Sequence, residues 1–206
     1  RIVRFDAPVM LAICLLLGIL SLDGDLGVRD GALMCVTLLV FLVLLFRTDA
    51  APDEEVDEGS TSLALVSVGI VAGLAGLVFG ADLLVEGAVT VARAFDVSER
   101  VIGLTLMAVG TSLPELASSL VAAYRGEVDL LVGNVVGSNI FNVLVVLGFT
   151  SLINPIPIDF DVVSPDLIVM LAFALSLWVG LGLRRRLFRL EGLVLVSCYF
   201  GYIATL

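Results

Sequence analysis

Residues 103–148 read GLTLMAVGTSLPELASSLVAAYRGEVDLLVGNVVGSNIFNVLVVLG. This stretch places a proline, a glutamate, hydroxyls and asparagines inside two segments that are otherwise apolar enough to sit in a membrane. Polar and ionisable groups are costly at membrane depth, and they mark the pathways of ions and substrates. The stretch therefore predicts a polar binding site within a membrane-spanning protein.

The composition of the whole chain also predicts a membrane protein. Hydrophobic residues make up 60% of it and the mean hydropathy is +1.15, well above the values of a globular domain. A spanning helix needs about 20 apolar residues, with about 17 as the lower limit. Seven segments come near that length: Ala7–Leu22, Gly31–Phe46, Leu63–Phe95, Val101–Tyr124, Leu130–Ile153, Leu167–Leu183 and Leu190–Leu206. We expect an all-α, polytopic membrane helix bundle with about seven transmembrane helices, the third long enough to be strongly tilted or bent.

All eleven basic residues are arginines, and their distribution predicts the orientation of the chain. Counted over alternate loops, one side carries Arg1, Arg4, Arg47, Arg125, Arg184, Arg185, Arg186 and Arg189, and the other carries Arg29, Arg93 and Arg100. The positive-inside rule assigns the arginine-rich side to the cytoplasm. We expect a multi-pass protein of the cell membrane with a cytoplasmic N-terminal end and an external C-terminus.

The net charge of −10 is concentrated in loops. We interpret the acidic linker at 47–62 as a solvated cytoplasmic segment. A regulatory cation site is the alternative, although the linker lacks the ligand spacing and turn glycine of a calcium loop. We expect no nucleic-acid partner. Cys14, Cys35 and Cys198 are scattered over hydrophobic segments, and we interpret them as packing residues rather than metal ligands or disulfide partners.

The chain contains an internal repeat. Residues 6–12 read DAPVMLA and residues 166–172 read DLIVMLA, so both follow the pattern D-x-x-V-M-L-A. About 24 residues after each start, an acidic residue followed by glycine opens the next segment, at Asp30-Gly31 and at Glu191-Gly192. The shared order and spacing indicate a repeat with an offset of 160 residues (166 minus 6).

The repeat divides the chain into parts. Residues 63–206 form one complete five-helix unit, with the polar stretch at 103–148 inside it, and residues 1–46 match only its last two helices. An odd number of helices makes successive units insert with opposite orientations, as in many inverted-repeat transporters. The offset places the start of the first unit about 97 residues before Arg1, so we expect the C-terminal part of a protein of about 300 residues. A natural product of 206 residues and separately encoded halves are the alternatives.

Pro114 predicts a break in the helix that carries Glu115. Proline has no N–H, and its ring opposes the carbonyl four residues earlier, that of Gly110. Such breaks occur at membrane depth where the backbone lines a cavity enclosed by protein. Thr111, Glu115 and Ser119 follow one another at four-residue steps and are expected to share a face.

The next segment carries a second polar face, formed by Asn134, Ser138 and Asn142 at the same spacing. Two antiparallel neighbours would present carboxylate, hydroxyl, amide and carbonyl oxygens to each other, with no imidazole or thiolate. Na⁺ and Ca²⁺ prefer such ligands, whereas zinc and copper do not. The spacing of Gly133 and Gly137 predicts a close approach of this helix to its partner. The plainer interpretation is a kinked helix pair whose hydroxyls bond to the backbone.

The sequence lacks the residues that common catalytic sites require. The chain has no histidine for a Ser–His pair, and residues 103–148 offer neither two facing acids nor a phosphate loop that follows a strand. We expect no enzymatic activity. Asp82 and Glu86 lie four apart in the long third segment, where like charges repel. We favour a position near the outer interface for them, with an ion pathway as the alternative.

The paired motifs resemble those of a known family. GTSLPEL at 110–116 and GNVVGSNIFN at 133–142 resemble the second α-repeat of the calcium/cation antiporters, the sodium/calcium exchanger superfamily. GADLLVEGAVTVA at 80–92 resembles the helix that leads into that repeat. The resemblance implies a fold of ten helices in two inverted halves, with four cation sites around two central glutamates, one from each half.

Residue by residue, the resemblance implies an ion site with ligands from both polar helices. The implied ligands are the carbonyl of Ala108 and the side chains of Thr111, Ser112, Glu115, Ser138 and Asn142. Glu115 would be the central carboxylate of this half, and Thr111 and Ser112 would be Na⁺ ligands. In several members, including the potassium-dependent branch, the last position is aspartate, so Asn142 argues against potassium dependence.

We therefore predict a secondary active antiporter that exchanges Ca²⁺ for Na⁺, with these ions as its cargo and no organic cofactor. One glutamate does not neutralise Ca²⁺, and an uncompensated charge in a low-dielectric site is expensive. This chain is expected to supply half of the site, and a missing N-terminal half with the first α-repeat to supply the rest. The alternatives are Ca²⁺/H⁺ exchange with Glu115 as the proton carrier, and an uncoupled, channel-like cation-binding subunit.

Overall fold

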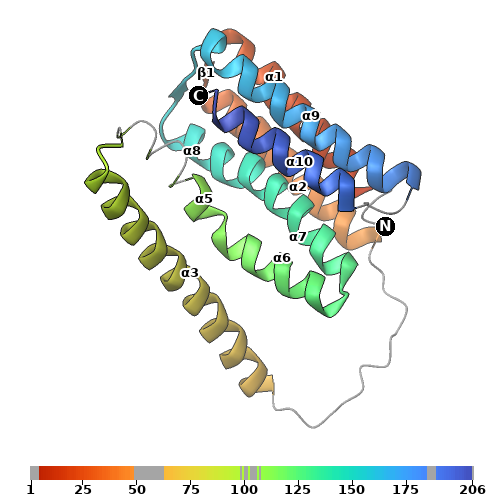
Figure 1. The fold of residues 1–206 in the computed structure, drawn as a ribbon. Coiled ribbons are helices and arrows are strands. Elements are labelled where there is room, and N and C mark those ends of the chain that lie inside the picture. Colours follow the sequence, from red (N-terminus) through yellow and green to blue (C-terminus); the bar gives the residue numbers. More distant parts are fainter. Residues whose placement is uncertain are drawn as a thin grey trace. The chain divides into compact units, whose positions relative to one another are not determined.

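A computed structural model describes residues 5–48, 63–97, 99, 102, 106, 108–184 and 189–205. The described chain is predominantly helical and divides into two compact units (Figure 1). Unit 1 comprises Arg1–Ala51 and Val132–Val196, and unit 2 comprises Pro52–Leu131 and Ser197–Leu206. The acidic linker expected at 47–62 lies outside the described residues from position 49 onward.

Unit 1 contains both N-terminal helices and most of the chain after Val132. Its elements are α1 (Asp6–Leu20), the 3₁₀ turn η1 (Ser21–Asp23), β1 (Asp25–Leu26), α2 (Val28–Thr48), most of α7 (Val128–Phe141), the π-helical segment η3 (Asn142–Leu147), α8 (Gly148–Ile153), β2 (Ile156–Pro157) and α9 (Phe160–Arg184). The last helix, α10 (Arg189–Ile203), begins in unit 1 and ends in unit 2.

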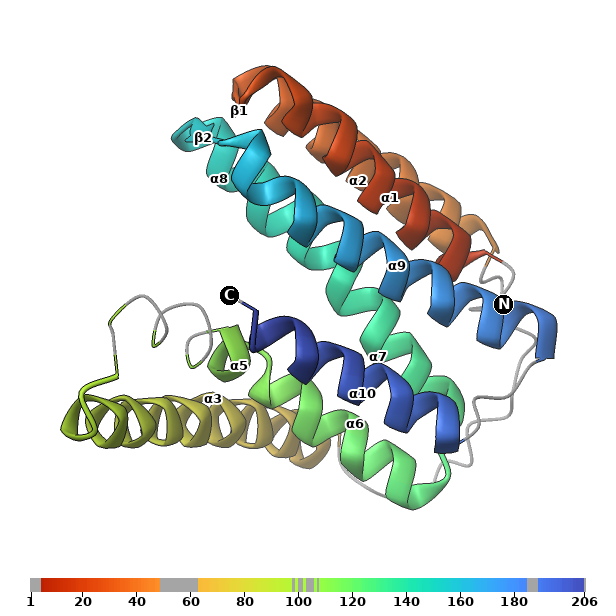
Figure 2. The same cartoon turned by 45° about the horizontal axis from the view of Figure 1, so that its top comes forward.

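The core of unit 1 is built from two helix contacts. Helix α1 lies beside α9, and α2 packs against α8 and η3 (Figure 2). The buried residues of α1 include Ala7, Met10, Cys14 and Leu17, which recur every three or four residues and therefore form one apolar face. The two helices that carry the repeated sequence pattern, α1 and α9, thus pack against each other.

Two short strands join the turns at one end of unit 1. Strand β1 pairs antiparallel with β2, and Asp25 lies opposite Pro157. The amide of Ile158 donates to the carbonyl of Gly24 at 2.8 Å, and Gly24 adopts the left-handed conformation, with φ +93°, that favours glycine. The predicted order of crossings places these two turns on the same side of the membrane. The pairing of β1 with β2 agrees with that order, because paired strands must lie at the same end of the helices.

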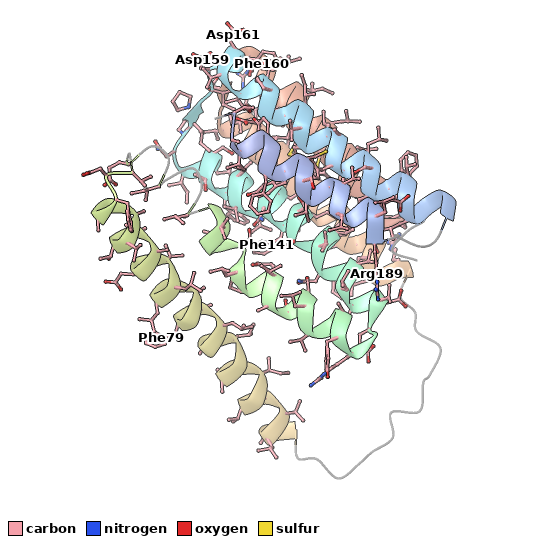
Figure 3. The ribbon with its side chains drawn as sticks, in the orientation of Figure 1. Phe79, Phe141, Asp159, Phe160, Asp161 and Arg189 are labelled. Carbon is pink, nitrogen blue, oxygen red and sulfur yellow. The ribbon has the colours of Figure 1, made fainter. Side chains whose placement is uncertain are left out.

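Charged residues lie at both ends of unit 1. Asp159 and Asp161 flank Phe160, the first residue of α9, and Arg189 lies at the start of α10, at the opposite end (Figure 3). The Oδ1 atom of Asp159 accepts a hydrogen bond from the amide of Asp161 at 3.2 Å, which satisfies a backbone donor where α9 begins.

Unit 2 is built around one long helix, α3 (Leu63–Ala94), which packs against the short α5 (Ala108–Thr111) and against α6 (Leu113–Arg125). Phe79 is 66% exposed and points from α3 away from α6 (Figure 3). Arg93, in the last turn of α3, pairs with Glu99 at 2.7 Å. The hydrogen bond from Arg93 lowers the pKa of Glu99, but both side chains are exposed, so the pair adds little stability.

Five helical segments of the described chain are long and apolar enough to cross a membrane: Asp6–Asp23, Val28–Arg47, Ala64–Ala94, Val128–Ile153 and Phe160–Leu181. Of the other two predicted crossings, the one at 101–124 contains an interrupted helix, and α10 has 15 residues. The prediction of an all-α polytopic bundle is confirmed.

The closest helix crossing in unit 1 lies between α2 and α8. A Cβ atom at Gly31 would lie 2.7 Å from the carbonyl oxygen of Gly148 and 2.9 Å from the backbone nitrogen of Leu152. In unit 1, Gly31 and Gly148 are small residues that let two backbones approach each other. The close approach expected at Gly133 and Gly137 involves a partner helix in unit 2, and it stays a prediction.

Replacing Gly31 by alanine should destabilise the protein. The new methyl group would press on backbone atoms of α8, which cannot move aside as a flexible side chain can. We expect a loss of about 1–3 kcal/mol, measured by chemical or thermal unfolding in detergent. Gly18→Ala in α1 is the matched control, since a Cβ atom there would meet nothing within 4 Å. Equal stability of the two variants would contradict the crossing.

Candidate cation-binding site

The helix that carries Glu115 is interrupted one turn before it. Helix α5 ends at Thr111 and α6 begins at Leu113, with Ser112 at φ −98° and ψ 2° between them. The Ser112 amide donates to the carbonyl of Val109 at 3.0 Å, three residues back instead of four. Pro114 lies in the first turn of α6, where its missing N–H is tolerated. The predicted break through Gly110–Pro114 is confirmed.

The break places Glu115 in the first turn of α6. Its side chain is half-buried, and its Oε2 atom is fully buried. The positive end of the helix dipole favours a carboxylate at this position. Glu115 and Ser119 remain four apart on one continuous helix, whereas Thr111 belongs to the separate helix α5. The face predicted from four-residue steps is therefore divided by the break.

Helix α3 packs directly against the break. Gly110 is buried, and a Cβ atom at this position would overlap a methyl group of Val85 on α3. Only glycine fits without displacement of that side chain. The contact ties the long helix of unit 2 to the residue just before Thr111.

Two polar side chains near the predicted ligands bond to their own helices. The hydroxyl of Ser118 lies 3.0 Å from the carbonyl oxygens of both Pro114 and Glu115. The side-chain amide of Asn139 donates to the carbonyl of Val135 at 2.8 Å. The plainer interpretation, hydroxyl and amide groups satisfied by the backbone, therefore describes these contacts.

Ser138 and Asn142 lie one turn apart in unit 1. The hydroxyl of Ser138 donates to the carbonyl of Val135 at 3.1 Å, which leaves the lone pairs of its oxygen able to face a cation. Asn142 is exposed and is the first residue of the π-helical segment η3. The side chains of these two residues offer one hydroxyl and one amide oxygen.

The π-helical segment was not foreseen from the sequence. Segments of this kind are rare and often occur at functional sites. Buried residues step by four through this region, at Val132, Val136, Ile140, Leu144 and Gly148. An α-helix has 3.6 residues per turn, so strict four-residue steps rotate around it, and a wider π turn counteracts that rotation. η3 thus keeps Leu144 and Gly148 facing α2.

The six predicted ligands divide between the two units. Ala108, Thr111, Ser112 and Glu115 lie together around the break in unit 2, and Ser138 and Asn142 lie together in unit 1. Within the described residues no group of three or more acidic, histidine or cysteine side chains is placed to hold a metal ion. The available donors are one carboxylate with hydroxyl, amide and carbonyl oxygens, which suit Na⁺ and Ca²⁺. Asp82 and Glu86 are exposed on α3, and their role stays a prediction.

Comparisons with known proteins find one family of similar sequences. The family model described as "Sodium/calcium exchanger protein" matches residues 65–206. A protein named CaxA from Alkalimonas amylolytica is 40% identical over 212 residues, covering 97% of this chain and 66% of CaxA. The sodium/calcium exchanger MaX1 of Methanosarcina acetivorans is 43% identical over 118 residues, covering 56% of this chain and 34% of MaX1.

A solved structure has the same fold. The sodium/calcium exchanger from Methanococcus jannaschii aligns with a TM-score of 0.78 and 30% identity, over 96% of this chain and 63% of that one. The chain thus spans less than two thirds of the length of this exchanger, and 66% of CaxA.

Substitution of Gly110 by alanine should destabilise unit 2, and a second substitution should restore it. The added methyl group would overlap Val85, and we expect a loss of about 1–3 kcal/mol in unfolding measurements. Val85→Ala removes the obstructing methyl groups, so the double variant should recover much of that loss. Gly87→Ala, on α3 with no neighbour within 4 Å, is the control. Strictly additive losses would show that α3 does not contact the break.

Proposed function

Because the chain belongs to the sodium/calcium exchanger family, we propose that it is part of a secondary active antiporter that exchanges Ca²⁺ for Na⁺ across the cell membrane. The observation that carries the proposal is the helix break that sets Glu115, with a buried carboxylate oxygen, inside a segment flanked by membrane-spanning helices. A carboxylate at that depth is costly unless it meets a cation or a proton.

Charge balance explains how such a site exchanges ions. One carboxylate leaves Ca²⁺ under-neutralised, whereas two would compensate it, and in the absence of Ca²⁺ the same two would need Na⁺ ions or protons. Since only a compensated site passes a low-dielectric barrier readily, Ca²⁺ and its counter-ion compete for one site. In our proposal this chain contributes Glu115, and a first repeat contributes the second carboxylate.

The remaining ligands follow from the residues around the break and around η3. Thr111 and Ser112 lie about one turn before Glu115, where α5 ends, and the carbonyl of Ala108 lies at the start of α5. Ser138 and Asn142 supply the hydroxyl and the amide of the other polar helix. All of these donors are oxygens, which supports a hard cation as cargo.

The chain is a multi-pass membrane protein, and its repeat plan and orientation are part of the proposal. In our assignment residues 1–46 close the first repeat and residues 63–206 form the second. The contact between α1 and α9, which carry the repeated pattern, supports this division. A cytoplasmic N-terminal end would put the β1–β2 turns outside, in keeping with their shared end of unit 1.

Glu115→Gln should abolish high-affinity Ca²⁺ binding by the full-length protein. The substitution keeps the shape of the side chain and removes its charge, so we expect at least a tenfold loss of affinity, about 1.4 kcal/mol or more. Equilibrium binding of ⁴⁵Ca²⁺ to purified protein measures it. Glu99→Gln, at an exposed carboxylate outside the break, should bind as the parent does. Unchanged affinity in Glu115→Gln would remove the central residue from the proposal.

The counter-ion is decided by transport into vesicles at clamped pH. We expect Ca²⁺ uptake by reconstituted full-length protein to require an opposing Na⁺ gradient. Uptake driven by a pH gradient without Na⁺ would establish Ca²⁺/H⁺ exchange with Glu115 as the proton carrier. Uptake with neither gradient would establish an uncoupled cation pathway.

Ser138→Ala should weaken Na⁺ binding severalfold, because it removes a proposed oxygen ligand. The measured quantity is the Na⁺ concentration that displaces half of the bound ⁴⁵Ca²⁺. Ser176→Ala is a matched control, since the hydroxyl of Ser176 also donates to a carbonyl three residues earlier, at 2.8 Å, but lies in α9. Equal effects of the two substitutions would assign Ser138 a structural role only.

A further inference from the structure

Unit 2 contains a pocket that lies beyond the proposed ion ligands, toward the end of α6. Its volume is about 420 Å³, within the range of ligand-binding pockets. Its walls are mostly apolar, with Leu77 from α3, Val121 and Ala122 from α6 and Leu130 from α7. The lining also includes Ala117, Ser118 and two charged residues, Arg125 and Glu127. All of these residues belong to unit 2.

The charged end of the pocket lies where the hydrophobic segments end. Arg125 is the last residue of α6, and Gly126, at φ +75°, turns the chain toward α7 in a left-handed conformation. The candidate membrane span Val128–Ile153 begins two residues later. Tyr124 is 94% exposed, and tyrosines are enriched at membrane–water boundaries. The pocket therefore extends from the boundary into the apolar layer.

The two charges at this end are available to a ligand. Within the described residues no ion pair or hydrogen bond joins the side chains of Arg125 and Glu127, although they are two positions apart. The backbone of Glu127 is fixed, because its amide donates to the carbonyl of Ala122 at 2.9 Å. The lining of this mostly apolar pocket thus includes a guanidinium and a carboxylate.

We propose that this pocket binds a zwitterionic glycerophospholipid that carries a primary amine. An acyl chain would lie against Leu77, Val121 and Leu130. The phosphate would accept hydrogen bonds from the guanidinium of Arg125, and the ammonium group would donate to the carboxylate of Glu127. A lipid with only negative charge would be repelled by Glu127, and a trimethylated amine has no N–H to donate to it.

The bound lipid would connect α3 with α6. Leu77 and Val121 lie on these two helices, which also meet where Val85 covers Gly110. A ligand that binds only the folded state stabilises it. The lipid should therefore raise the thermal stability of the protein, and this effect does not depend on which ions the protein transports.

The test measures lipid retention by the full-length protein with native mass spectrometry and thermal unfolding. Phosphatidylethanolamine, phosphatidylcholine and phosphatidylglycerol with the same acyl chains are added in turn. We expect one ethanolamine lipid retained per protein and a higher midpoint of unfolding. Retention of the other two should be weaker by about fivefold or more, because each lacks one charge-assisted hydrogen bond or meets repulsion.

Three variants separate this pocket from general contact with the bilayer. Arg125→Gln and Glu127→Gln should each lower retention of the ethanolamine lipid by about fivefold. Val121→Trp fills the apolar part and should abolish retention while leaving both charges in place. Arg47→Gln, at the last turn of α2 in unit 1, is the control and should retain lipid as the parent does.

Several results would overturn the proposal. Equal retention of the three lipids, or retention that neither charge substitution changes, would show that the bound lipid is not held by Arg125 and Glu127. A full-length protein in which another segment occupies the pocket would retain no lipid at all. If Val121→Trp fails to fold, the two charge variants alone decide. Lipid retention is measured without reference to Ca²⁺ binding. The lipid proposal can therefore fail while the proposal for Glu115 holds, and the reverse is also possible.

Discussion

Backbone hydrogen bonding inside an apolar segment is the constraint on which the candidate site depends. In a membrane each N–H and C=O group needs a partner within the protein, so a spanning segment is normally one continuous helix. Pro114 supplies no N–H, and the helix ends at Thr111 and restarts at Leu113. The restart gives Glu115 a position in a first helical turn, where the helix dipole stabilises its charge. Ion binding, as we propose it, begins from this interruption.

Close contacts at glycines join neighbouring helices near the polar residues. In unit 2, Val85 covers Gly110, so the long helix α3 is in contact with the break itself. In unit 1, Gly31 packs on Gly148 at the end of the π-helical segment, whose first residue is Asn142. In unit 2 the proposed ligands are therefore at most five residues from a contact that tolerates no side chain, and in unit 1 Asn142 is six residues from one. Such contacts transmit small displacements, because tightly packed groups cannot absorb them.

The polar groups serve different purposes although they look alike in the sequence. Ser118 and Asn139 form hydrogen bonds within their own helices, and Arg125 and Glu127 line an apolar pocket. Glu115 lies between these extremes, half-buried with one carboxylate oxygen inaccessible. Burial and the identity of the hydrogen-bond acceptor, more than residue type, separate structural polar groups from candidates for ion or lipid binding.

The sequence by itself determined the membrane class, most of the spanning segments, the break before Glu115 and the family. Hydropathy and the missing N–H of proline are local properties, so they need no knowledge of neighbours. Only the tertiary structure decided that Gly31 makes a close crossing with α8, and that a π turn follows Phe141. Residues 143–147 are all apolar, so their periodicity marks no face. The contact of a glycine with a neighbouring backbone depends on which helices are adjacent in the fold. The same holds for the turn that keeps Gly148 against α2.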